Sequence, residues 1–140
     1  MSAFPRENGP QNPTQIDVLI VDDHPVTRAL LRDVVERHSD LSVVADAGYG
    51  EDAVSHAAQF QPAVALVDVH LPTMSGVEAT RQIKLRSPST AVIGLTTGEP
   101  DETDMAMLSA GASAIISKAD LVHRLYPAIK EVVNSLKAAI

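Results

Sequence analysis

The sequence predicts an α/β domain built on a doubly wound, five-stranded parallel sheet. Short, β-branched, nearly continuous apolar runs are typical of strands buried on both faces of a parallel sheet. They alternate five times with longer segments of helical period. The 140 residues suit a single domain. Five such units imply right-handed crossovers with helices on both faces, and we expect the strand order 2-1-3-4-5.

The chain before the first apolar run differs in composition from the rest. Residues 1–15 contain three prolines, two asparagines and a glycine, which favours a disordered N-terminal tail. Residues 16–140 then form the predicted domain. The expected strands are residues 16–21, 41–45, 63–67, 91–95 and 114–117.

The predicted helices follow these strands in turn. Pro25 suits the first turn of the first helix. The next three are expected at 50–59, 75–86 and 101–110. The last helix contains Pro127, which either kinks it or marks its first turn, and a four-residue pattern at 117–120 matches a capping box for it. The apolar stripe of the first helix is predicted to be Val26, Leu30, Leu31, Val34 and Val35.

Composition excludes several classes of function. Eleven basic residues against eighteen acidic ones give a net charge of −7, which argues against direct nucleic-acid binding by this chain. The absence of cysteine excludes disulfides and thiolate metal sites. No apolar run approaches the roughly 20 residues that span a bilayer, and no signal peptide is visible. We expect a cytoplasmic protein without a membrane partner.

Polar side chains follow four of the predicted strands. Asp22 and Asp23 come after the first, Asp68 after the third, Thr96 after the fourth and Lys118 after the fifth. Carboxyl ends of parallel strands share one edge of the sheet, where ligands bind. A helix N-cap explains one such aspartate but not three together.

Three carboxylates at close range raise one another's pKa unless a cation lies among them. Oxygen ligands with open positions suit Mg²⁺. A carboxylate nucleophile, a metal, a lysine and a hydroxyl can together perform phosphoryl transfer. The residues alone therefore indicate a Mg²⁺-dependent phosphoryl site, and they do not select the nucleophile.

The chain resembles the receiver domains of two-component response regulators over residues 16–136. The matching stretches are 18–25 (VLIVDDHP), 68–78 (DVHLPTMSGVE), 95–96 (LT), 110–112 (AGA) and Lys118, all in order. The Asp-Asp-His-Pro start and the lack of proline after Lys118 are most similar to the NarL/FixJ-type subgroup, whose receivers often precede a helix-turn-helix output domain. The resemblance implies a flavodoxin-like, CheY-like fold.

The resemblance also implies a role for each matching residue. Asp68 would accept the phosphoryl group and would also be one of the metal ligands. Asp23 would bind Mg²⁺ directly and Asp22 through water, and the backbone carbonyl of His70 would complete the protein ligands. The donor would be a sensor histidine kinase, a histidine phosphotransfer protein or a small acyl phosphate.

Further implied roles concern the phosphoryl oxygens and the neighbouring loop. Thr96 and Lys118 would each hold one phosphoryl oxygen, and Pro72 and Gly76 would shape the loop after Asp68. Ile115 stands three residues before Lys118, where many receivers carry a switch Tyr or Phe. Its side chain either points outward on a partner-binding face or fills the core, and we expect the first, because the fifth strand should be the sheet edge.

These implications predict a receiver that is phosphorylated on Asp68 and then controls an output domain or partner. We expect transcription regulation through a helix-turn-helix domain outside this chain, and dimerisation through the fourth helix, fifth strand and fifth helix. Catalysis would be limited to self-phosphorylation and self-dephosphorylation. The alternatives are a stand-alone receiver or phosphorelay protein, a pseudo-receiver, and a haloacid-dehalogenase-type phosphatase, whose second aspartate would stand where this chain has His70.

His24 and the side chain of His70 receive no role of their own. We interpret His24 as a loop or first-turn residue. The His70 side chain either hinders or orients the attacking water, or is an exposed loop histidine without a role.

Overall fold

The computed structural model describes residues 15–138, so most of the predicted tail lies outside the described residues. Five parallel strands form one sheet in the order β2-β1-β3-β4-β5, which confirms the predicted fold. The strands are β1 (Ile16–Val21), β2 (Leu41–Ala47), β3 (Val64–Asp68), β4 (Ala91–Thr96) and β5 (Ala112–Ser117). The helices are α1 (Pro25–Glu36), α2 (Gly50–Phe60), α3 (Gly76–Arg86), α4 (Glu102–Ala110) and α5 (Leu121–Ala138), with the 3-10 turn η1 (Lys118–Asp120) before α5.

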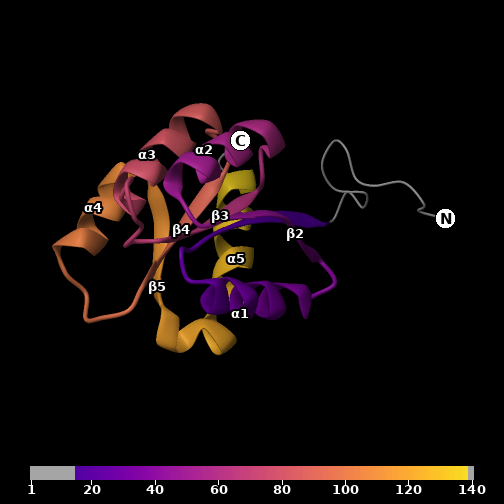
Figure 1. Cartoon of the computed structure of the whole chain (residues 1–140). Coiled ribbons are helices and arrows are strands. Elements are labelled where there is room, and N and C mark those ends of the chain that lie inside the picture. The colour runs from indigo at the N-terminus through magenta and orange to yellow at the C-terminus, as the bar shows by residue number, and fades with distance from the viewer. Residues whose placement is uncertain (1–14, 139–140) are drawn as a thin grey trace.

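Helices cover both faces of the sheet (Figure 1). Alternate residues of β1 point to opposite faces, so Val18 and Ile20 pack toward α1 and α5, whereas Leu19 and Val21 pack toward α2, α3 and α4. All four side chains are fully buried. This two-sided burial is the reason why the strand reads as a continuous apolar run.

The first helix begins at Pro25, as predicted, but its apolar stripe is narrower than expected. Leu31, Val34 and Val35 are buried, whereas Val26 is 83% exposed and Leu30 is 43% exposed. At 3.6 residues per turn, Val26 lies about 130° around the helix from the buried stripe. The period of the helix therefore places Val26 away from the side that packs against the sheet.

The last helix decides two open points. Pro127 lies inside α5, so the first-turn alternative is wrong. Ser117 caps η1 by accepting a hydrogen bond from the Ala119 N–H at 3.2 Å. The predicted capping-box pattern therefore begins the 3-10 turn and not α5.

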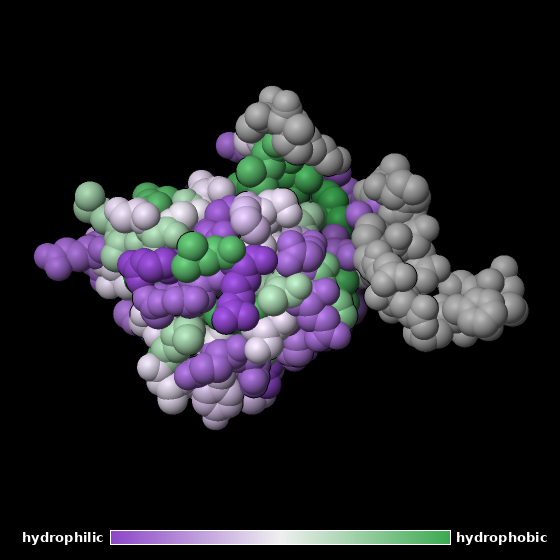
Figure 2. Space-filling model, turned by 90° about the horizontal axis from the view of Figure 1, so that it is seen from above, coloured by the Kyte–Doolittle hydropathy of each residue, from purple (hydrophilic) through white to green (hydrophobic). Residues whose placement is uncertain are grey.

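The face of the molecule over α2 and α3 is largely polar (Figure 2). Seen from the top of Figure 1, where α2 and α3 lie, hydrophilic residues dominate and apolar ones form small patches (Figure 2). Within residues 15–138, no helix has both the length and the apolar character needed to cross a membrane.

Candidate functional site

The carboxyl ends of the central strands bring the predicted polar residues together. Asp68 is the last residue of β3, and Asp22 follows β1, which is paired with it. Lys118, directly after β5, reaches across to both: its Nζ lies 3.0 Å from Asp68 Oδ2 and 2.6 Å from Asp22 Oδ2. Asp22 is fully buried and Asp68 is 3% exposed. Two buried carboxylates therefore share one ammonium group.

Local backbone turns fix both carboxylates. The His24 N–H donates to Asp22 Oδ1 and the His70 N–H donates to Asp68 Oδ1, each at 2.9 Å. Each aspartate thus bonds the N–H two residues further on, which is the Asx-turn arrangement. Because one oxygen of each carboxylate is held by the backbone, the other is directed toward Lys118.

Burial and charge act in opposite directions on this pair. Burial raises the pKa of Asp68, and the hydrogen bonds from the His70 N–H and Lys118 offset only part of that rise. Burial alone would lower the pKa of Lys118, but its hydrogen bonds to Asp22 and Asp68 leave that pKa raised overall. Lys118 therefore stays charged at neutral pH, and Asp68 would gain from a further cation nearby.

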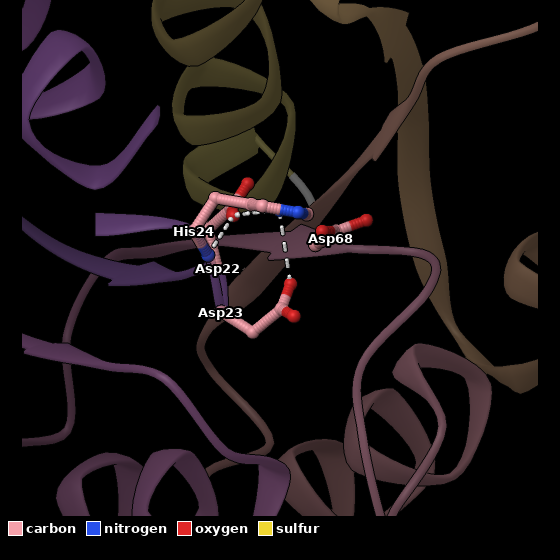
Figure 3. A group of neighbouring side chains, drawn as sticks. All are labelled: Asp22, Asp23, His24 and Asp68. Atoms are coloured by element: carbon pink, nitrogen blue, oxygen red, sulfur yellow. Dashed lines mark hydrogen bonds and ion pairs between the residues drawn. The ribbon is translucent and has the colours of Figure 1, made fainter. Parts of the chain in front are cut away.

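Four side chains form a compact group at this edge (Figure 3). Asp22, Asp23, His24 and Asp68 each offer one ligand atom, and these atoms all lie within 4.8 Å of one another. Asp23 Oδ1 is buried and accepts no hydrogen bond from the described residues. Three carboxylates with such an oxygen fit a divalent cation, and their hardness suits Mg²⁺.

His24 is the member of this group to which the sequence assigned no role. Its ring Nδ1 lies 3.2 Å from Asp23 Oδ1 and 3.5 Å from Asp22 Oδ1. It is the N-cap residue of α1, as its interpretation as a loop residue implies. The available signal was its position directly after the acidic pair and before a helix-starting proline.

The loop after β3 requires glycine at position 76. A Cβ there would lie 2.2 Å from the Asp68 carbonyl oxygen and 2.7 Å from the Val69 carbonyl oxygen. The Gly76 N–H also donates to the Val69 carbonyl at 3.1 Å. Earlier in the loop, the Pro72 carbonyl accepts from the Met74 N–H at 2.7 Å. Both predicted loop residues therefore lie in the turn that leads back beneath Asp68.

Thr96 and the His70 carbonyl lie at the same edge of the sheet as the acidic group. Thr96 is buried at the end of β4 and is paired in register with Ser117, next to Lys118. Its role, like that of the His70 carbonyl, stays a prediction.

Ile115 neither points outward into solvent nor is fully buried in the core. It is half-buried and packs against the core on the α4 side of the sheet. A Cβ on Gly94 would lie 2.8 Å from Ile115 Cδ1 and 2.9 Å from Met107 Cε, so the two side chains cover that glycine. With Thr96, Ile115 also lines a hollow of about 550 Å³ between α4, β5 and α5. β5 is indeed the sheet edge, but its side chains on this face meet α4.

Comparison with known proteins confirms the resemblance to receiver domains. The model of the response regulator receiver domain matches residues 18–130. The uncharacterized transcriptional regulatory protein YxjL of Bacillus subtilis is 35% identical over 85% of this chain and 55% of its own length. A protein-glutamate methylesterase/protein-glutamine glutaminase of Myxococcus xanthus is 38% identical over 72% of this chain, but only 29% of its own length. The chain therefore spans about half, or less, of these relatives.

The fold comparison agrees with the sequence comparison. The crystal structure of a LuxR-family two-component response regulator from Aurantimonas superposes with a TM-score of 0.81 at 27% identity, covering 86% of each chain. The family match favours a receiver domain over the alternative of a haloacid-dehalogenase-type phosphatase. The chain belongs to the response regulator receiver domains of two-component systems.

Proposed function

We propose that this receiver takes a phosphoryl group onto Asp68 from a sensor histidine kinase or histidine phosphotransfer protein, with Mg²⁺ as cofactor. The observation that carries this proposal is the position of Asp68. It ends the central strand β3, lies within the acidic group, and has one oxygen 3.0 Å from Lys118. The other Asp68 oxygen accepts from the His70 N–H at 2.9 Å, and these two contacts orient the carboxylate for in-line attack.

The chain's own residues account for most of the chemistry. An Asp68 oxygen attacks phosphorus, the O–P bond forms, and the N–P bond of the donor phosphohistidine breaks with its electron pair returning to the imidazole. Lys118 and Thr96 hold phosphoryl oxygens as charge develops. Asp23, Asp22 and the His70 carbonyl would hold Mg²⁺, which neutralises phosphoryl charge when bound. Attack by water on phosphorus then releases phosphate and regenerates the Asp68 carboxylate.

Phosphorylation would change the surface on the α4 side. The phosphoryl group adds about −1.5 to −2 charges beside Lys118 and Thr96. Thr96 also lines the hollow between α4, β5 and α5, so its movement toward the phosphoryl group would alter that face. We propose that two phosphorylated copies then dimerise through this face. We also propose that the change in this face, in the cytoplasm, controls a DNA-binding output domain outside this chain. The similarity to YxjL, which is named as an uncharacterized transcriptional regulatory protein, supports this output.

Intact-mass spectrometry after incubation with acetyl phosphate and Mg²⁺ tests the acceptor. The expected result is one added phosphoryl group, which is lost in Asp68→Asn and when the metal is chelated. Asp23→Ala should also fail to react, because it removes the direct metal ligand. Full phosphorylation of Asp68→Asn would reject Asp68 as the acceptor.

Sedimentation with and without beryllofluoride tests the output. A shift toward dimer is expected, and Met105→Lys should weaken it, because Met105 is 70% exposed on α4 and lines the same hollow. Met105 is preferable to Ile115 for this test, since Ile115 packs against the core. A monomer under both conditions would place the output on another surface.

A further inference from the structure

The backbone around His24 holds its ring over the acidic group. Proline at position 25 restricts the preceding residue to extended backbone, and His24 has φ −91° and ψ 115°. Its N–H is tied to Asp22 Oδ1 at 2.9 Å. With both neighbours fixed, the side chain is directed across the pocket toward Asp23 and Asp68 (Figure 3).

The resulting set of ligand atoms is compact enough for one ion. One ring nitrogen of His24 and one oxygen from each of the three aspartates lie within 4.8 Å of one another. Donor atoms that share an ion at about 2.0–2.2 Å lie no more than about 4.4 Å apart, so only small adjustments are needed. The buried Asp23 Oδ1, which accepts no hydrogen bond from the described residues, lies 3.2 Å from the ring nitrogen. One ion placed between these two atoms would satisfy both.

The ring nitrogen changes the chemical character of the pocket. Carboxylate and carbonyl oxygens suit Mg²⁺, whereas imidazole suits Zn²⁺, Cu²⁺, Fe²⁺ and Ni²⁺, and affinities for such sites rise along the first transition row. The His24 side chain is 68% exposed. It can therefore turn toward an ion without disturbing the core.

We propose that His24 is an imidazole ligand through which this pocket binds borderline transition-metal ions, and that it raises the affinity for these ions relative to Mg²⁺. The inference rests on the proposed metal site but not on phosphorylation. The alternative is a protonated ring that only forms ion pairs with Asp22 and Asp23. The two possibilities predict different metal affinities when the ring is replaced by an oxygen ligand of similar size.

Metal-binding calorimetry on the full, unphosphorylated chain tests this inference with Co²⁺ and Mg²⁺ as the ions. The informative variant is His24→Asn, because asparagine is a good N-cap for α1 and offers an oxygen in place of the nitrogen. The control is His56→Asn on α2, whose ring lies beside Phe60 and outside the acidic group. The measured quantity is the ratio of the Mg²⁺ to the Co²⁺ dissociation constant.

We expect His24→Asn to lower this ratio by about tenfold or more, mainly through weaker Co²⁺ binding, and His56→Asn to leave it unchanged. In nitrogen-15 spectra, the His24 ring signal should shift on addition of Zn²⁺ far more than on addition of Mg²⁺. An unchanged ratio in His24→Asn, or a ring signal indifferent to Zn²⁺, would overturn the inference.

The same titrations separate this inference from the proposed function. If Mg²⁺ binding is present and is lost in Asp23→Ala, the carboxylate site stands, and an unchanged ratio in His24→Asn overturns only the ligand role of His24. If neither ion binds, or if Asp23→Ala binds both normally, the metal site itself is misplaced and both proposals fail.

Discussion

Replacing Gly76 by alanine should disrupt the turn that supports the phosphorylation site. The added Cβ would lie 2.2 Å from the Asp68 carbonyl oxygen, 2.7 Å from the Val69 carbonyl oxygen and 2.8 Å from Val69 Cα. Cβ atoms essentially never approach other atoms more closely than 3.0 Å, so the backbone must move by at least about 0.8 Å. All three neighbours are backbone atoms, and no side-chain rotation can relieve the contact.

The expected cost is about 2–3 kcal/mol of unfolding free energy, which corresponds to a fall in Tm of about 10 °C for a domain of this size. Displacing Asp68 by such an amount should also slow its phosphorylation by about 10²-fold. Thermal unfolding followed by circular dichroism measures the first effect, and timed intact-mass spectrometry with acetyl phosphate measures the second.

Gly98→Ala is the matched control for stability. A Cβ at Gly98 meets no atom within 4 Å, so its unfolding free energy should change by no more than about 0.5 kcal/mol. If Gly76→Ala is as stable as Gly98→Ala, the steric reasoning is refuted.

Three further predictions concern charge. Burial raises the pKa of Asp68 above 3.8, so ionisation of this carboxyl disfavours the folded state. Asp68→Asn should therefore raise the free energy of unfolding at pH 7 by on the order of 1 kcal/mol. Urea unfolding should show that this gain vanishes as the pH falls below about 4. Lys118→Met should lower the free energy of unfolding by about 2 kcal/mol, because it leaves the buried carboxylates of Asp22 and Asp68 without their ammonium partner. Added Mg²⁺ should recover part of this loss, and a variant as stable as the parent would contradict the pairing. The hydrogen bond from Lys130 lowers the pKa of Asp40 below 3.8, so this stabilisation is present at neutral pH and lost as the pH falls through the folded-state pKa. Asp40→Asn should therefore lower Tm at pH 7, and this difference should shrink as the pH falls below 3.8; a difference that does not shrink in acid would exclude this cause.

The strands and the starts of the first four helices could be predicted because local rules decide them, whereas the start of α5 was left open by Pro127. The β1 sequence is apolar at successive positions since both faces of the sheet are covered, and Pro25 and Gly111 mark a helix start and a helix end by their backbone restrictions. The apolar stripe of α1 was predicted too wide. At 3.6 residues per turn Val26 lies about 130° from the buried residues of α1, so the predicted stripe was wider than one side of a helix.

The identities of the strand-end residues were sufficient to nominate the acidic group, because parallel strands must place their carboxyl ends at one edge. Three aspartates, a threonine and Lys118 therefore predicted where the group lies before any distance was known, and the chemistry of the site stays a prediction. The resemblance to receiver domains added individual roles, which stay predictions until phosphorylation and metal binding are measured.

The sequence by itself determined the order of elements, the edge that carries the site and the residue types available there. Only the tertiary structure decided which atoms meet: that Lys118 reaches Asp22 as well as Asp68, that Ile115 and Met107 cover Gly94, and that the His24 ring faces Asp23. The physical reason is the separation along the chain between the residues that interact. Strand and helix formation follows from neighbours a few residues apart, whereas these contacts join residues that are far apart in the chain, or depend on side-chain directions set by the packed sheet.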